Sequence, residues 1–331
     1  MTKSILAITA ALAACTGSQG AEGPAGPPGA AGSAGAATVD QVVLPGSAFF
    51  PESIVAASDG SLFVTSLKDG AVAKIAPDHQ TVTTFLPAQA TQPIGRAGML
   101  LDEPHDRFWV CQFSNDFSKP STLDRYNLAT GAFEESHALA DPAAACNDIA
   151  SDAAGNLYVT DSFLGIERLP ASAAATDPLH LWATGAAYQP ATVGAFAVNS
   201  IAIDGANVYT DNLDRGILAR TPISPDGSAG TAVEIAGVTL TACDGMRWAA
   251  PNTLLVAEGE GALSKIVINP AHDTGVRDVV SNRIDRPSAV AVTDGAAWVT
   301  EGQIRRMFGL DPTPTSVPFL VQRVELFDDK R

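Results

Sequence analysis

The chain has 331 residues and a formal net charge of −16, with a sequence pI of about 4.5. Such an acidic surface repels phosphate backbones, so we expect no nucleic-acid partner. Hydrophobic residues make up 46% of the chain, but no stretch beyond the first 15 residues is long and apolar enough for a transmembrane helix. The length suits one large closed β domain or two ordinary domains.

Residues 1–15 have the features of an export signal. Lys3 gives a positive start, residues 5–14 form an apolar run too short to span a bilayer, and small residues precede Cys15. The stretch resembles a bacterial lipoprotein signal, which implies that Cys15 is lipidated and anchors an exported protein to the membrane of the cell envelope. Because Thr16 rather than Asp follows Cys15, we expect the outer membrane. The alternative is an ordinary secretory signal and a secreted protein.

Residues 16–38 follow as a Gly-X-Y-rich segment, with six triplets between residues 20 and 37. Glycine at every third position is the requirement of a collagen triple helix. Six triplets with few prolines favour a flexible or polyproline-like tether instead. We therefore expect a monomer, with a trimer formed through this stretch as the alternative.

A sequence pattern that predicts a strand, a turn and a second strand occurs six times after this segment. The copies share an apolar run, a turn and a second apolar run, and they span residues 52–66, 98–111, 147–161, 199–211, 244–257 and 287–300. A repeat of about 45 residues with short alternating strands is typical of a β-propeller. We predict an all-β, six-bladed propeller over residues 39–331, with four antiparallel strands per blade around a central channel. Residues 317–327 and 39–44 are expected to close the ring within one blade, which removes exposed strand edges.

Four polar residues occupy the first position of the inner strand in different blades: Glu52, Asn147, Asn199 and Asp244. In a propeller these positions converge on one end of the channel. Their carboxylate and amide oxygens suit one divalent cation, most of all Ca²⁺, with Mg²⁺, Mn²⁺ or Zn²⁺ as alternatives. The alternative interpretation is structural, because Asn and Asp at strand starts often hydrogen-bond nearby backbone amides.

These motifs resemble those of the senescence marker protein, gluconolactonase and regucalcin family of six-bladed propellers. The resemblance implies a divalent metal bound by Glu52, Asn199 and Asp244, with Asn147 as a further ligand or substrate contact. It also implies hydrolysis of lactones or related cyclic esters, in which the metal polarises the carbonyl and Asp244 acts as general base.

Two features depart from the family. Its sugar lactonases carry an arginine two residues before the third-blade Asn, where this chain has Ala145, and residues 113–122 form an insertion. Both favour altered or lost activity. The alternative is therefore a non-enzymatic propeller at the cell envelope. In this alternative the ion only stabilises the fold, and the channel face binds a ligand or a protein partner.

The remaining cysteines and acids are interpreted as structural. We expect Cys111 to be a buried apolar residue, and a disulfide between Cys146 and Cys243 is conceivable in an oxidising compartment, although their blades are not neighbours. Acidic residues also recur at the ends of second strands, where we expect them to hydrogen-bond adjoining turns: Asp161, Asp211, Glu258 and Glu301.

Overall fold

The computed structural model describes residues 39–89 and 94–326. The predicted signal at 1–15, with Cys15, and the predicted tether at 16–38 lie outside the described residues. Within the described part of the chain, no helix is long and apolar enough to cross a membrane.

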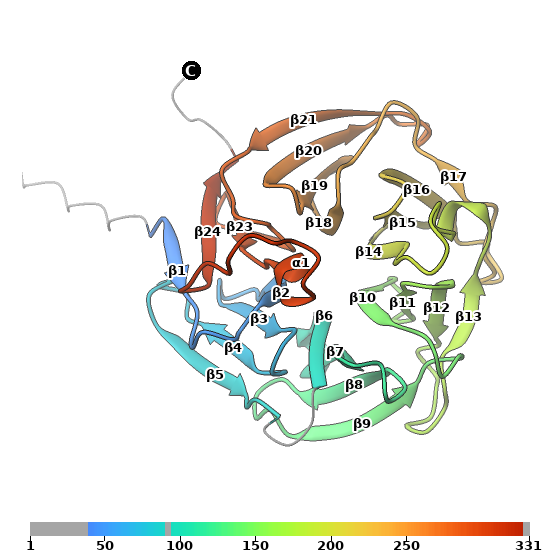
Figure 1. Cartoon of the computed structure of the whole chain (residues 1–331). Coiled ribbons are helices and arrows are strands. Elements are labelled where there is room, and N and C mark those ends of the chain that lie inside the picture. The colour runs from blue at the N-terminus through green and yellow to red at the C-terminus, as the bar shows by residue number, and fades with distance from the viewer. Residues whose placement is uncertain (1–38, 90–93, 327–331) are drawn as a thin grey trace, which may run out of the picture. The chain divides into compact units, whose positions relative to one another are not determined.

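Six four-stranded antiparallel sheets surround a common axis, which confirms the predicted six-bladed propeller (Figure 1). Neighbouring inner strands contact one another around the whole ring. From blade 1 to blade 6 the inner strands are β2 (Pro51–Ala56), β6 (Ile94–Asp102), β10 (Cys146–Ser151), β14 (Val198–Asp204), β18 (Cys243–Ala250) and β22 (Val290–Thr293).

The other strands follow outward in each blade. The second strands are β3 (Leu62–Ser66), β7 (Arg107–Ser114), β11 (Leu157–Asp161), β15 (Asn207–Asn212), β19 (Thr253–Glu258) and β23 (Ala296–Thr300). The third are β4 (Val72–Ile75), β8 (Thr122–Asn127), β12 (Gly165–Leu169), β16 (Ile217–Pro222), β20 (Ala262–Ile268) and β24 (Leu320–Glu325). The outer are β5 (Val82–Leu86), β9 (Phe133–Ala138), β13 (His180–Ala183), β17 (Val233–Glu234), β21 (Gly275–Ser281) and β1 (Gln41–Val43).

The ring closes in the sixth blade, as predicted. Strand β1 is the outermost strand there and pairs antiparallel with β24, with Val42 opposite Val321. The Leu44 amide continues this pairing beyond the strand by donating to the Phe319 carbonyl at 2.9 Å. The two ends of the propeller thus complete one sheet, and no blade is left with three strands.

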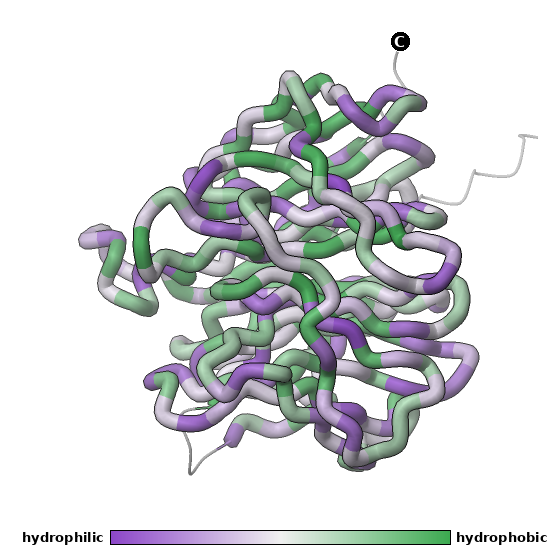
Figure 2. Tube along the Cα trace, turned by 90° about the vertical axis from the view of Figure 1, so that its right-hand side faces the viewer, coloured by the Kyte–Doolittle hydropathy of each residue, from purple (hydrophilic) through white to green (hydrophobic). Residues whose placement is uncertain are grey.

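The core consists of apolar clusters between adjacent blades. Phe63 of blade 1 meets Phe108 of blade 2 with ring centroids 5.9 Å apart, and both rings are buried. Viewed from the side, hydrophobic and hydrophilic residues interleave along the chain and do not separate into two halves of the molecule (Figure 2). This distribution follows from short strands that alternate between core and solvent.

Five of the six inner strands carry a β-bulge close to their first residues, at 52–53, 97–98, 147–148, 199–200 and 244–245. In blades 1 and 3 a threonine of the second strand accepts a hydrogen bond from a backbone amide of the bulge. In blade 3 the hydroxyl of Thr160 accepts from the Asp148 amide at 2.8 Å and donates to the Asn199 carbonyl of the next blade at 2.6 Å. The same threonine therefore caps one bulge and ties two blades together.

The disulfide joins Cys111 to Cys146, with Cα atoms 5.3 Å apart. A disulfide between Cys146 and Cys243, which the sequence left conceivable, does not form, because Cys243 is a buried free thiol. Cys111 is buried as expected, but it is not an isolated apolar residue. It occupies the threonine position of blade 2, so a covalent bond to blade 3 stands where blades 1 and 3 use a hydrogen bond to the next blade.

A short segment crosses the end of the channel after β23. Helix α1 (Ile304–Met307) lies inside the ring (Figure 1). Ile304 and Met307 pack both on the core shared by blades 1 and 6 and on the core shared by blades 2 and 3. The segment therefore connects two separate interblade cores. The other short helices are the 3-10 turns η1 (Glu103–His105) and η2 (Ala186–Tyr188).

Candidate metal and substrate site at the channel end

The four residues singled out from the sequence lie together at one end of the channel. Glu52, Asn147 and Asp244 line one cavity. Asn199 belongs to the same cluster, because its side-chain amide donates to Asp244 Oδ1 at 3.1 Å. The cavity has a volume of about 10 Å³, which is room for one water molecule or one ion.

Two of the expected ligands present oxygen atoms that lack a hydrogen-bond donor. Glu52 Oε2 and Asn199 Oδ1 are buried without a partner, and both side chains are themselves buried. An unpartnered buried acceptor is costly, and its presence in a native fold calls for an explanation. A bound cation would satisfy both oxygens, so these residues fit the implied metal.

The electrostatics of the cluster also favour a bound cation. Burial, followed by the charges of Asp244 and Asp148, raises the pKa of Glu52 well above its ordinary value. Burial, followed by the charge of Asp211, likewise raises the pKa of Asp244. Two carboxylates that resist ionisation next to each other are stabilised in the charged form by an added positive charge.

Asp148 and Arg247 are channel residues that sequence reasoning missed. The Arg247 guanidinium donates to both Asp148 oxygens, at 2.8 and 3.1 Å, and Asp148 Oδ2 also accepts from the Ile201 amide at 3.2 Å. The bulge of β10 explains why both Asn147 and Asp148 line the cavity, since strict alternation would place neighbouring residues on opposite faces. Two adjacent polar residues at the start of an otherwise apolar strand were the available signal.

The donor set limits what a cation could use. Within residues 39–89 and 94–326, no three His, Cys, Asp or Glu side chains gather closely enough to hold a metal by themselves. Asp148 forms an ion pair with Arg247. The carboxylates that remain to bind a cation are those of Glu52 and Asp244. A cation here would therefore depend on amide oxygens such as that of Asn199, a mixture that suits hard cations better than zinc.

The acids at the ends of the second strands have structural partners. Asp161 accepts from the Ala145 and Phe163 amides at 3.0 and 3.1 Å. Glu258 accepts from the Thr241 amide at 2.6 Å and pairs with Arg277 at 2.7 Å. These contacts fix the turns around the channel end and agree with the structural interpretation of the acids.

A group of aromatic side chains lies at the same end of the channel. Phe113, Phe117, Phe163 and Phe196, which we call the phenylalanine patch, come from the end of β7, the loop after it, the loop after β11 and the loop before β14. The predicted insertion at 113–122 supplies two of them. Apolar rings therefore flank one side of the polar cluster.

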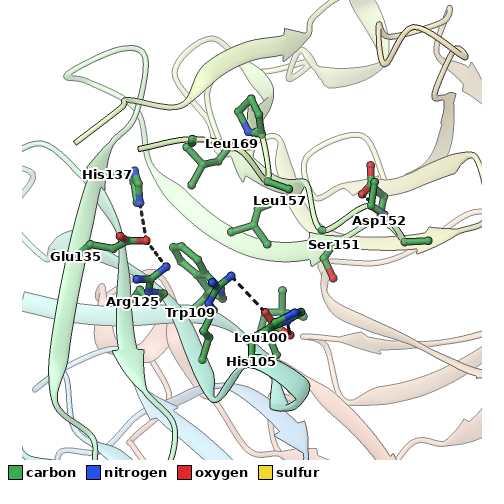
Figure 3. Close-up of a pocket in the computed structure, with 18 residues that line it drawn as sticks. Leu100, His105, Trp109, Arg125, Glu135, His137, Ser151, Asp152, Leu157 and Leu169 are labelled. Atoms are coloured by element: carbon green, nitrogen blue, oxygen red, sulfur yellow. Dashed lines mark hydrogen bonds and ion pairs between the residues drawn. The ribbon is translucent and has the colours of Figure 1, made fainter. Parts of the chain in front are cut away.

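A larger pocket of about 370 Å³ lies between blades 2 and 3, at the other end of β10 from Asn147. Figure 3 shows Trp109 beside Arg125, with Glu135 and His137 on one side of them and Leu157 and Leu169 on the other. Arg125 pairs with Glu135 at 2.7 Å and lies 5.3 Å from the Trp109 ring centroid. This pocket, called the interblade pocket below, contains none of the residues predicted from the sequence.

Comparison with solved structures supports the fold at low identity. The chain is similar to a luciferin-regenerating enzyme, with 14% identity, a TM-score of 0.60 and coverage of 87% of this chain and 92% of that one. It is also similar to the major Malassezia sympodialis allergen Mala s 1, with 14% identity, a TM-score of 0.66 and coverage of 87% and 97%.

Virginiamycin B lyase from Staphylococcus aureus is a further structural neighbour, with 15% identity, a TM-score of 0.52 and coverage of 79% of this chain and 80% of that one. No family model and no curated protein matches the sequence. Propellers of this shape thus include enzymes, and the fold alone does not fix an activity.

Proposed function

We propose that the protein is a divalent-metal-dependent hydrolase of lactones or related cyclic esters, with Ca²⁺ as the preferred ion. The observation that carries the proposal is the pair of buried, donor-free oxygens on Glu52 and Asn199 next to Asp244. The proposed ligands are Glu52, Asn199 and Asp244. When bound, the cation would polarise the carbonyl of the ester as a Lewis acid.

Asp244 is the proposed general base. Its Oδ1 is held by the Asn199 amide at 3.1 Å, which leaves Oδ2 to accept a proton from a water molecule. The water oxygen then attacks the carbonyl carbon, the ring C–O bond breaks, and the proton passes from Asp244 to the departing alkoxide. Because the cavity holds little more than an ion, the ester lies at its mouth, where Asn147 can contact it.

Arg247 is proposed as a positioning residue. Asp148 holds its guanidinium by two hydrogen bonds, and the guanidinium charge lowers the pKa of Glu52 against the larger effects of burial, Asp244 and Asp148, which raise it. It therefore helps to keep the Glu52 carboxylate ionised and available as a ligand.

The test is hydrolysis of a lactone panel by the domain from Val39 onward, with Ca²⁺, with Mn²⁺ and with a chelator. We expect metal-dependent turnover that Asp244→Ala abolishes. The matched control is Asp278→Asn, which removes an exposed carboxylate on β21. A melting curve unchanged by chelator, in a protein that contains no metal, would contradict the metal site.

The second candidate is a non-enzymatic propeller that binds a ligand or protein partner at the cell envelope, with the ion as a staple. Two observations favour it: the channel cavity is small, and the interblade pocket has the size of small-molecule sites. Metal-dependent stability without turnover on any lactone would support this candidate over the hydrolase.

The cellular location belongs to the same proposal. We propose that Cys15 carries a lipid that anchors the protein at the envelope, in the outer membrane. Mass spectrometry of the mature N-terminus tests this, with Cys15→Ser as the variant that should release the protein from membranes.

A further inference from the structure

We propose that the phenylalanine patch binds an apolar, aryl or alkyl, substituent of the ester substrate, so that the enzyme prefers hydrophobic lactones to small or polar ones. This inference rests on the proposed hydrolase function and names its substrate class.

The patch is a continuous aromatic surface built from separate segments. The Phe163 and Phe196 rings stack with centroids 5.0 Å apart, and Phe117 lies 6.4 and 6.0 Å from them. Phe113 adds a fourth ring 6.1 Å from Phe117. These separations are typical of interacting aromatic pairs, so the rings present one surface and not four isolated contacts.

The patch adjoins the proposed site through Ser162. The Asn147 side-chain amide donates to Ser162 Oγ at 3.1 Å, and Phe163 is the next residue. The Ala197 amide donates to the Ser162 carbonyl at 2.8 Å, which places Phe196 on the other side. A ligand that contacts Asn147 is therefore within reach of these two rings.

Phe117 combines an exposed ring with a left-handed backbone conformation. The residue is 49% exposed, and its φ of 53° is left-handed, a conformation rare for a large non-glycine residue. Strained backbone and exposed aromatic surface both cluster at functional sites. An apolar substituent would cover the exposed ring and gain the free energy of its burial.

The loop that carries Phe117 is fixed by its own polar residues. The Ser118 amide donates to Asp116 Oδ1 at 3.0 Å, and Ser114 Oγ donates to the same oxygen. The Asn115 side chain donates to the Lys68 carbonyl of blade 1 at 2.9 Å. The Asp116 carboxylate thus forms its hydrogen bonds within the loop. These bonds hold the loop in one conformation, so the exposed Phe117 ring is already in place before a ligand binds.

The test compares γ-phenyl-γ-butyrolactone with γ-butyrolactone, which differ only by the phenyl group. For the wild-type domain with Ca²⁺ we expect kcat/KM at least tenfold higher for the phenyl lactone. Phe117→Ala and Phe163→Ala should each lower this ratio several-fold. Phe133→Ala is the matched control, because Phe133 is exposed on the outer strand β9 and contacts Tyr126; it should leave the ratio unchanged.

Binding of both lactones to Asp244→Ala, followed by saturation-transfer NMR, separates this inference from the proposed hydrolysis. Phenyl-dependent binding that Phe117→Ala removes, without turnover in the wild type, would support the patch and overturn the hydrolase. Turnover with the same ratio in wild type and Phe117→Ala would overturn the patch and keep the hydrolase. Absence of both binding and turnover would overturn both.

Discussion

Asp148 and Arg247 link blades 3 and 5 across the channel with a charge pair. Asp148 is 7% exposed and Arg247 is 22% exposed as side chains. Removing one partner of such a pair leaves the other charge in poorly solvated surroundings, which costs more than the pair itself contributes. The pair therefore matters chiefly for the arrangement of the site, and its effect on stability appears when it is broken.

We expect Arg247→Met to lower the free energy of unfolding by about 2–3 kcal/mol, less than for a fully buried pair because Arg247 reaches solvent. Adding Asp148→Asn should recover at least about 1 kcal/mol, since the unpaired charge is then gone. Urea unfolding of both single variants and the double variant measures the coupling. Strictly additive losses would contradict the pairing.

Glu167 on β12 is a further residue whose negative charge is disfavoured. Burial is the main cause that raises its pKa to about 7, and Oε1 has no hydrogen-bond partner, whereas Oε2 accepts from the Ala140 amide at 2.8 Å. The folded state keeps the proton up to about pH 7, whereas the unfolded chain releases it near the ordinary glutamate value. Stability should therefore fall as the pH rises between these two values.

We expect Glu167→Gln to flatten this decline by up to about 1.4 kcal/mol per pH unit between roughly pH 5 and pH 7. The glutamine keeps the acceptor for Ala140 and cannot ionise. Urea unfolding at several pH values, in the presence of chelator, measures the slope. An unchanged slope would show that Glu167 is ionised in the folded protein.

At the scale of elements, one position of the second strand adds a tie between neighbouring blades in blades 1, 2 and 3. Thr65 donates to the Ala97 carbonyl at 2.9 Å and Thr160 to the Asn199 carbonyl at 2.6 Å. Cys111 replaces this hydrogen bond with a disulfide to Cys146, which directly precedes Asn147. The covalent bond thus fixes the strand that carries one of the site residues.

We expect Cys111→Ala to lower the free energy of unfolding by about 3–4 kcal/mol, the value for a loop of this length. Cys111→Thr should lose about 1 kcal/mol less, because its hydroxyl can form the hydrogen bond that Thr65 and Thr160 make in blades 1 and 3. Thermal unfolding under oxidising and reducing conditions compares the two variants. Equal losses would show that the threonine position does not act as a tie in blade 2.

The repeat predicted the elements well but could not predict every contact at the channel end. Short strands with turn residues between them indicate blades whatever the details, so six copies were sufficient for the fold. Asp148 was missed because a bulge changes which side chains face the channel, and alternation alone does not reveal a bulge. The Cys111–Cys146 pairing was missed because it depends on which blades adjoin at that position, and α1 is too short for a periodic pattern.

At the scale of the whole molecule, a strand of only three residues closes the ring. Strand β1 contributes Val42, which is buried, and Leu44 beyond its end is also buried. The Arg323 amide donates to the Asp40 carbonyl at 2.8 Å on the other side. Without these residues β24 would become an exposed edge with unpaired backbone groups.

We expect a domain that begins at Gly46 to be less stable by several kcal/mol than one that begins at Val39, because burial of Val42 and Leu44 contributes about 1.5–3 kcal/mol each. It should also associate through the exposed edge of β24. Thermal unfolding and light scattering compare the two domains. Equal stability and a monomeric shorter domain would show that β1 is dispensable for closure.

The shared sixth blade also makes the starting point of the sequence arbitrary for the fold. Gln41 and Gln322 are paired neighbours in one sheet, so a short linker could join the two ends of the propeller, and new ends could be opened in a turn between other blades. Such a circular permutant would keep every blade, and its new chain ends would lie away from the sixth blade. Circular permutation is tolerated where the original ends lie close together and the new ends fall in exposed turns. The propeller is therefore expected to fold with its chain ends in any of several interblade turns.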